Sequence, residues 1–244
     1  MEKEIVHIHQ VVTRLPELRF AEPVEWRICE GEQWAVVGPN GAGKTLLADI
    51  LQRKFAFREG EVCYNKEGKV SDIIRSIAFK DIYSLADCRN SYYQQRWHAT
   101  ESDDVPTVAE TLSAYEGTEN LKEVLHIFGI EDLLPKKLIY LSSGELRKFL
   151  IVRTLLSRPE ILILDNPFIG LDAPSRDLLV DMLGQLSHLH GVQVILLLSN
   201  PADIPDMITH VLPIAGKKCY PPMSREAFLA DTALIQVLFP EENW

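Results

Sequence analysis

Residues 38–45, which read GPNGAGKT, constrain this chain more than any other feature. They match the pattern G-x-x-x-x-G-K-[ST], in which glycines turn the backbone so that N–H groups face phosphate oxygens. The apolar run at residues 33–37 predicts a buried strand before the loop, and residues 46–53 have the apolar spacing of a helix after it. The positive end of that helix would face the same anion. The sequence therefore predicts a nucleoside triphosphate site.

Each residue of this loop has an expected role. The ATP-binding residues are Gly38, Pro39, Asn40, Gly41, Ala42, Gly43, Lys44 and Thr45. Lys44 would reach the β- and γ-phosphates, and the Thr45 hydroxyl would bind Mg²⁺. The alternative is a chance glycine turn before a helix. That alternative does not explain the strand predicted before the turn. ATP and Mg²⁺ are therefore the expected cofactors.

Asp165 belongs with the phosphate loop. It follows the apolar run ILIL at residues 161–164, which predicts a buried strand. A carboxylate at the carboxyl end of such a strand, beside a phosphate loop, is well placed to hold Mg²⁺. We expect Thr45 and Asp165 to form the metal site, and Lys44 and Asp165 to act in catalysis.

The charge balance of the chain bears on its partners. With 244 residues and a formal net charge of −10, it lacks the positive surplus of proteins that bind nucleic acid without regard to sequence. No direct contact with nucleic acid is expected. No apolar run approaches the roughly 18 residues that a membrane-spanning helix needs. The cysteines are scattered and contain no C-x-x-C pair, which favours reduced thiols over disulfides or a zinc site.

Residues 141–145 read LSSGE and precede a stretch with helical spacing at residues 146–160. Two interpretations of this pentapeptide stay open. In the first, Ser142, Ser143 and Gly144 expose N–H groups at a helix N-terminus and form a second anion-binding device. In the second, the segment is a helix cap with the acidic Glu145 in the first turn.

The order and spacing of these motifs resemble the ATP-binding cassette (ABC) ATPases, in which an LSGGQ-type signature precedes the aspartate-bearing strand. Gly170, Leu171 and Asp172 resemble the family's D-loop, and residues 192–198 resemble the strand before its switch loop. The resemblance covers nearly the whole chain. Three segments are similar to the first half of stand-alone tandem ABC ATPases of the molybdate-transport/photorepair-associated group. They read GPNGAGKTLL, QQRW and ITHVLPI.

The resemblance implies an α/β fold of the P-loop NTPase class, with a RecA-like, mostly parallel sheet and an antiparallel β portion near the N-terminus. The whole chain, 1–244, would be a single nucleotide-binding domain. Its RecA-like and β core would comprise 1–83 and 151–244, and a helical subdomain with the signature would comprise 84–150. Apolar spacing predicts amphipathic helices over residues 108–115 and 121–130, after a loop at 101–107.

The resemblance also implies partners. Two cassettes of this family share their active sites, so Ser142, Ser143, Gly144 and Glu145 would contact nucleotide bound to a second cassette. That cassette could be another copy, a different subunit or the second half of a tandem chain. The family commonly serves a separate membrane permease, which implies a cytoplasmic protein that can lie at the inner face of the membrane.

The chain departs from the family pattern at two catalytic positions. Hydrolysing members carry Glu after the Walker B aspartate, whereas this chain has Asn166. An amide holds water but takes no proton at neutral pH, and loss of a positioned base costs about 10²–10⁴ in rate. The switch loop offers Asn200 in place of the usual His. Both changes predict weakened hydrolysis. An engineered replacement of Glu at 166 is the alternative, but the simultaneous Asn200 favours a natural site.

Two family landmarks lack obvious counterparts. The aromatic residue that stacks on adenine falls by counting at Arg14 or Leu15. The Q-loop glutamine should follow a strand around residues 77–79, yet the next segment, KDIYSLADCRN, contains none. Gln94 and Gln95 are the nearest candidates for this Mg²⁺ contact. An alternative for the aromatic-polar segment that contains them is a partner-docking surface.

The leading hypothesis is an ABC-type ATPase subunit or half that converts ATP and water to ADP and phosphate. ATP would drive association with the second cassette, coupled to transport through the permease. One rival is a soluble, non-transport tandem protein that acts on another machine. Another is a nearly inactive nucleotide sensor. The substrate is not readable from these motifs.

Overall fold

The fold is known from a computed structural model, which describes residues 3–79 and 106–240. Its strands are β1 (Glu4–Thr13), β2 (Val24–Cys29), β3 (Trp34–Val37), β4 (Phe57–Tyr64), β5 (Ile74–Ala78), β6 (Ile161–Asp165), β7 (Gln193–Leu198), β8 (His210–Ala215), β9 (Lys218–Cys219) and β10 (Met223–Ser224). Its α-helices are α1 (Lys44–Leu51), α2 (Val70–Ile73), α4 (Val108–Leu112), α5 (Glu119–Phe128), α6 (Ser143–Leu155), α7 (Ala173–His190), α8 (Arg225–Ala230) and α9 (Thr232–Leu238).

The larger sheet carries the nucleotide-binding elements. Its strands follow the order β10-β8-β3-β7-β6-β5, with β9 paired to β8 off this path. The pairs from β8 through β3, β7 and β6 to β5 are parallel, and β9 and β10 are antiparallel to β8. Strands β3, β6 and β7 are buried along their whole length, as their continuous apolar runs predict for the centre of a parallel sheet.

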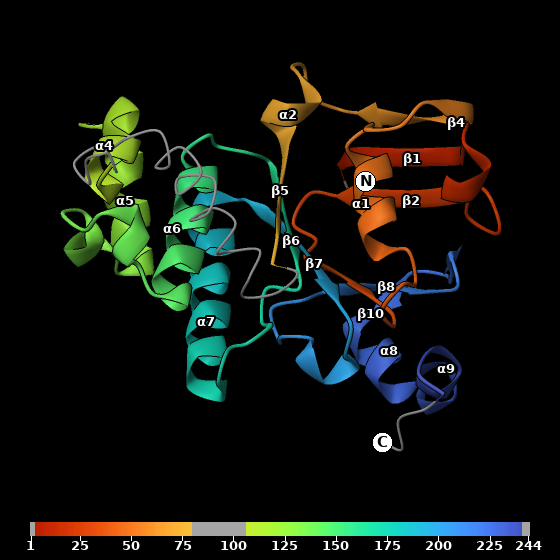
Figure 1. Cartoon of the computed structure of the whole chain (residues 1–244). Helices are drawn as coiled ribbons and strands as arrows, with labels where there is room; N and C mark the ends of the chain where they lie inside the picture. The colour runs from red at the N-terminus through yellow and green to blue at the C-terminus, as the bar shows by residue number, and fades with distance from the viewer. Residues whose placement is uncertain (1–2, 80–105, 241–244) are drawn as a thin grey trace, which may run out of the picture.

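A smaller antiparallel sheet, in the order β2-β1-β4, forms the N-terminal portion. Its buried face includes Ile8 and Trp26, which belong to the same hydrophobic cluster as Leu47 and Ile50 of α1. Figure 1 shows this sheet beside α1, on the far side of the molecule from α4 and α5. The predicted α/β fold, with its mostly parallel sheet and antiparallel portion, is confirmed.

Helices α4, α5 and α6 lie together at one end of the molecule (Figure 1). Helix α5 packs against both α6 and α7, α6 packs against β5, and α7 packs against β7. Their apolar side chains, including Phe128 and Phe149, share one hydrophobic cluster with Leu164 and Leu196 of the parallel sheet. Helix α6 runs across position 150, where the sequence predicted the end of a helical subdomain. The domain boundaries themselves stay a prediction.

Four predicted helices differ from the observed ones at their ends. The helix predicted over 46–53 is α1, which begins at Lys44 and ends at Leu51. The helix predicted over 108–115 is α4 followed by a 3-10 turn at Ser113–Tyr115. Helix α5 ends at Phe128 because Gly129 takes a left-handed φ of 56°. Helix α6 ends at Leu155, and Arg158 then takes a φ of 52° just before Pro159, which cannot continue a helix.

Candidate functional site

The phosphate loop connects β3 to α1, as the sequence predicts. Gly43 precedes the helix with a φ of 108°, a backbone conformation that residues other than glycine rarely adopt. A Cβ on Gly38 would stand 1.9 Å from the carbonyl oxygen of Ile214 in β8, so only glycine fits there. The backbone turn and the neighbouring strand together explain two of the loop's glycines.

Lys44 opens α1 and is 6% exposed. Its Nζ donates to the carbonyl oxygens of Gly38, at 2.6 Å, and of Pro39, at 2.9 Å. The amine therefore lies within the curve of the loop that would surround the phosphates. Burial lowers the pKa of Lys44 to about 8, against the opposing effect of the Asp165 carboxylate.

Thr45 and Asp165 meet at the edge of the sheet. The Thr45 hydroxyl donates to Oδ2 of Asp165 at 2.7 Å, although the residues are 120 positions apart. Asp165 ends β6 and is 5% exposed. A hydroxyl and a carboxylate are the hard oxygen ligands that Mg²⁺ prefers, so both side chains fit the predicted metal site. Bound Mg²⁺ would neutralise phosphate charge there.

Asn166 directly follows Asp165 and has a left-handed φ of 53°. Its Nδ2 donates to Oδ1 of Asp165 at 3.1 Å, and its Oδ1 accepts from the Ser199 hydroxyl at 3.3 Å. The Ser199 oxygen also lies 2.9 Å from Oδ1 of Asn40 in the phosphate loop. Ser199 was not among the site residues predicted from the sequence. Ser199 directly follows the apolar strand β7, which lies between β3 and β6. Its position at the end of this apolar run was the signal from which it could have been predicted.

An open cavity of about 750 Å³ joins these side chains. Its wall includes Thr45, Asp165, Asn166, Ser199 and Asn200. The predicted switch residue Asn200 therefore reaches the same space. Its side-chain oxygen, however, accepts from the backbone N–H of Ala202 at 2.8 Å and caps the short turn that follows β7. In this arrangement the side-chain oxygen of Asn200 stabilises the turn.

The signature segment forms a capping box at the start of α6. Ser142 is the N-cap, and its hydroxyl accepts from the N–H of Glu145 at 3.2 Å. The Glu145 carboxylate in turn accepts from the N–H of Ser142 at 2.8 Å and from Nζ of Lys136 at 2.8 Å. Ser142 and Ser143 are exposed, and no signature residue lines the cavity described above. The helix-cap interpretation holds, and the exposure of Ser142 and Ser143 leaves the anion-binding interpretation open.

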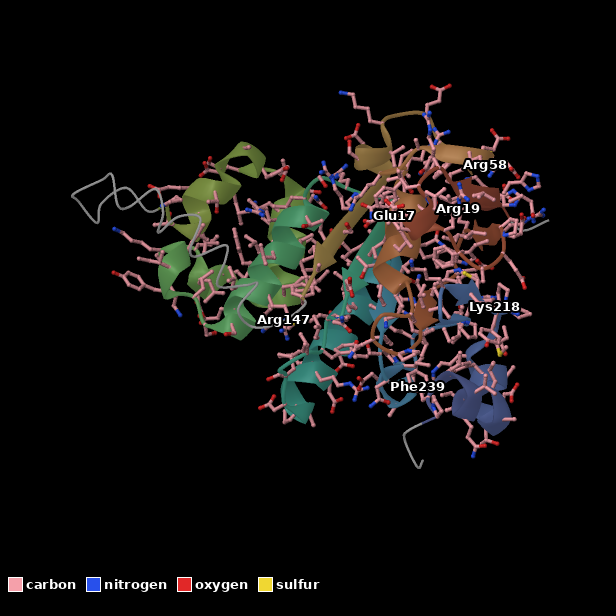
Figure 2. All side chains as sticks on the ribbon, turned by 45° about the vertical axis from the view of Figure 1, so that its right-hand side comes forward. Glu17, Arg19, Arg58, Arg147, Lys218 and Phe239 are labelled. Carbon is pink, nitrogen blue, oxygen red and sulfur yellow. The ribbon has the colours of Figure 1, made fainter. Side chains whose placement is uncertain are left out.

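Arg147 links α6 to two other elements of the site (Figure 2). Its Nη2 donates to the carbonyl oxygen of Ile169 at 2.7 Å, in the segment before the predicted D-loop. Its guanidinium lies over the Phe79 ring at 5.3 Å, and the Phe79 N–H donates to the carbonyl of Asp165 at 2.8 Å. The signature helix is therefore connected to the strand end that carries the metal ligand.

The D-loop residues Gly170, Leu171 and Asp172 precede α7. Gly170 has a φ of 71°, and the Asp172 side chain caps α7 by accepting from the N–H of Ser175 at 3.0 Å. Leu171 lines the cavity, as does Arg176 from the first turns of α7. The cavity is therefore bordered by the D-loop as well as by the phosphate loop.

Phe20 is the aromatic side chain that the described residues place beside the phosphate loop. Its Cζ lies 3.4 Å from where a Cβ on Gly43 would stand, and so does Cγ of Lys217. The Lys217 N–H donates to the carbonyl of Ala42 at 2.9 Å, and the Lys217 carbonyl accepts from Ala21 at 2.7 Å. Counting back along the sequence gave Arg14 or Leu15, whereas the structure brings Phe20, five or six positions later, beside the loop.

The other expected contacts were Arg14, Leu15, Gln94 and Gln95. Leu15 is 50% exposed, and the Arg14 carbonyl accepts from Nη2 of Arg19. The atoms nearest to a Cβ on Gly43 belong to Phe20 and Lys217 and not to either of these residues, so the structure offers Phe20 as a further choice. Gln94 and Gln95 lie outside the described residues, and the Q-loop assignment stays a prediction.

The sequence matches the ABC transporter family over residues 21–169, a range that holds the phosphate loop, the signature segment and Asp165. This chain belongs to that family. An ABC ATPase domain in general binds ATP with Mg²⁺ and hydrolyses it. The recognition of an ABC ATPase domain from the sequence is thus confirmed.

Individual relatives agree with this assignment. An ABC transporter ATP-binding protein of Schizosaccharomyces pombe is 31% identical over 80% of this chain and 42% of its own length. ModF, an ABC transporter ATP-binding protein of Escherichia coli, is 29% identical over 97% of this chain and 48% of its own length. The chain thus spans less than half the length of these relatives.

Solved structures share the fold. CbiO1 of Clostridium perfringens superposes with a TM-score of 0.77 at 17% identity, covering 98% of this chain and 97% of that one. The ADP form of the ATP-binding cassette MJ1267 gives a TM-score of 0.73 at 16% identity, covering 98% and 99%. Within the described part of the chain, no helix has both the length and the apolar character needed to cross a membrane.

Proposed function

We propose that this ABC domain binds Mg-ATP on its own phosphate loop, hydrolyses it slowly, and uses ATP binding to associate with a second cassette. The observation that carries the proposal is Asn166. It stands beside Asp165 at the wall of the cavity, where the family's general base would stand. An amide at this place can orient water but cannot accept its proton at neutral pH. Binding is retained while the chemical step is weakened.

The residues that bind ATP in this proposal are those of the phosphate loop. Lys44 would leave the carbonyl oxygens of Gly38 and Pro39 to contact the β- and γ-phosphates. Thr45 and Asp165 would bind the metal, and Phe20 would stack on the base. The aromatic ring and the loop lie side by side, which supports this division between base and phosphate contacts.

The partner in this proposal is a second ABC cassette. Ser142 and Ser143, at the start of α6, are exposed and lie outside the cavity of their own chain, as a surface that caps another chain's nucleotide requires. Because the chain spans less than half of two relatives, a tandem half fits this surface as well as a separate subunit does. We propose that Ser142, Ser143, Gly144 and Glu145 face the partner's nucleotide.

Coupling to transport through a membrane permease is the wider proposal, and it would place the chain at the inner face of the membrane. CbiO1, which has the same fold, is described as part of the ABC transporter complex cbiONQ. The rival is a soluble tandem ATPase, which the lengths of the relatives favour. A permease gene beside this one would support transport. A second cassette in the same reading frame with no permease nearby would support the rival.

Equilibrium binding of labelled Mg-ATP tests the core of the proposal. We expect saturable binding of one nucleotide per chain. In Lys44→Ala the affinity for Mg-ATP should fall at least about tenfold, because a charge-assisted contact is removed. Lys54→Ala is the matched control, since that lysine is half-exposed and pairs with Asp49 at 2.7 Å. Equal binding by all three proteins would contradict the assigned site.

A further inference from the structure

The smaller sheet carries a group of metal-ligating side chains far from the phosphate loop's cavity. His7 and His9 alternate along β1 with Ile8, which is fully buried, so both imidazoles lie on the outer face of the sheet. In the antiparallel register His7 lies opposite Arg27 of β2, which places Glu25 beside His9. Figure 1 shows this sheet on the far side of the molecule from α4 and α5.

The three side chains converge. Nε2 of His7 lies 2.5 Å from Oε1 of Glu25, and Nδ1 of His9 lies 3.2 Å from Oε2 of the same carboxylate. One ligand atom from each of the three residues falls within 4.8 Å of the others. Among the residues that the structure describes, no other group of histidine, cysteine and acidic side chains meets this criterion.

Glu25 is held in place. The backbone N–H and the side-chain amide of Gln10 each donate to its Oε2 at 3.1 Å. These two donors fix the orientation of the Glu25 carboxylate. A carboxylate fixed by other donors and charged at neutral pH is ready to bind a cation.

His7 has an orienting partner as well. Its Nδ1 lies 3.9 Å from a carboxylate oxygen of Glu4, on the side opposite Glu25. Metal-binding histidines commonly direct their second ring nitrogen at a carboxylate, which fixes the tautomer and raises the basicity of the ligating nitrogen. Glu4 can serve this role for a metal bound at Nε2.

One positive group competes for the same atoms. Arg27 donates through Nε to Nε2 of His7 at 3.3 Å and lies 3.8 Å from Glu25. Its side chain is 63% exposed, so it can leave the group without opening the core. On the other flank of β1, Cys63 of β4 lies opposite His7 and Glu61 lies opposite His9. Neither residue joins the three side chains whose ligand atoms lie within 4.8 Å of one another, so water or another exchangeable ligand would take the remaining position.

We propose that His7, His9 and Glu25 form a binding site for a divalent transition metal of the zinc class. Two imidazoles and a carboxylate are a ligand set that zinc uses with a fourth, exchangeable position. Oxygen-seeking Mg²⁺ and Ca²⁺ are poor matches for imidazole nitrogen, which separates this site chemically from the one at Asp165. Bound metal would tie β1 to β2 in the sheet that shares a hydrophobic cluster with α1.

Zinc titration of the nucleotide-free chain tests this site. We expect one strongly bound equivalent, detected by competition with a chromophoric chelator, and a rise in melting temperature on zinc addition. His9→Gln should weaken that binding by at least about tenfold, the effect that loss of even an outer-shell partner has in zinc sites. His9 is the suitable position because its side chain is 56% exposed, so the fold tolerates the change.

The matched control is His126→Gln. His126 is 88% exposed and also pairs with a carboxylate, Glu131 at 3.5 Å, but has no third ligand nearby among the described residues. We expect it to bind zinc as the unaltered chain does. Absence of a strongly bound equivalent, or equal binding by the unaltered chain and His9→Gln, would overturn the proposal and leave an ion-pair network on the sheet surface. The tetrahedral absorption bands of bound Co²⁺, lost in Glu25→Gln, would support it independently.

Discussion

The Thr45 hydroxyl and the Asp165 carboxylate meet at 2.7 Å, joining the first helix of the chain to the end of β6. Neither residue is near the other in sequence, and β7 lies between the strands that deliver them. The contact brings together two oxygen ligands suited to Mg²⁺ beside a loop suited to phosphate. The order of the strands in the sheet therefore brings the residues of the nucleotide site together.

Thr45→Val should weaken Mg-ATP binding about tenfold. The change keeps the shape of the side chain but removes the oxygen that faces the metal and the donor to Oδ2 of Asp165. Hydrogen bonds to charged groups contribute about 1.5–3 kcal/mol. Calorimetric titration with Mg²⁺ and with EDTA measures the effect, which should vanish in EDTA. Thr111→Val is the control, because that hydroxyl donates only within α4. A loss of equal size in EDTA would show that Thr45 does not act through the metal.

ATP binding near pH 8 should be accompanied by proton uptake. The pKa of Lys44 is lowered to about 8 from 10.5, so part of the free chain carries a neutral amine there, and bound phosphate favours the charged form. Affinity should accordingly fall as pH rises above 8. For folding the sign is opposite. The unfolded chain holds this proton more tightly, so the contribution of Lys44 to stability rises as the amine loses its proton between pH 8 and 10.5.

Calorimetry in buffers with different ionisation enthalpies measures this uptake. Lys44→Met should abolish it, whereas Lys54→Met should leave it unchanged. If the uptake at pH 8 is the same in all three proteins, another group is responsible and the low pKa of Lys44 is wrong.

Gly38→Ala and Gly144→Ala should have opposite effects on stability. At Gly38 the added methyl meets the backbone of Ile214, so we expect a loss of at least about 1–3 kcal/mol, typical of overpacking. At Gly144 the methyl meets nothing within 4 Å, and alanine favours the helix by about 0.5–1 kcal/mol. Urea denaturation measures both. Equal destabilisation would contradict the packing described for the loop.

Phe20→Ala should weaken ATP binding about tenfold and leave the binding of inorganic tripolyphosphate unchanged. Stacking of a base on an aromatic ring contributes about 1–3 kcal/mol, and tripolyphosphate has no base. Phe20→Trp should restore ATP binding. If both ligands lose affinity together in Phe20→Ala, the ring supports the loop of Gly43 and does not read the base.

The features that the sequence predicted are those formed by residues within one continuous segment. The phosphate loop required glycines, and the strands before Thr45 and at Asp165 required continuous apolar runs, so their places were readable. The helix-cap interpretation of Ser142 was readable too, because serine and glutamate three residues apart form a capping box.

Contacts between distant elements were not readable. Ser199 joins Asn40 to Asn166 only because β7 lies between β3 and β6, and strand order is not written in any one segment. Phe20 lies beside Gly43 because backbone hydrogen bonds tie Ala21 to Lys217 and Lys217 to Ala42, contacts between distant segments that counting along the chain cannot show. The helix ends likewise depended on left-handed residues such as Arg158, for which sequence carries little signal.

The most direct test of the central claim is single-turnover hydrolysis of labelled Mg-ATP by the unaltered chain and by Asn166→Glu, across a range of protein concentrations. We predict that the unaltered chain retains bound ATP, and that Asn166→Glu forms ADP about 10²–10⁴ times faster at concentrations where two cassettes associate. Prompt ADP formation by the unaltered chain, with no acceleration in Asn166→Glu, would contradict the account.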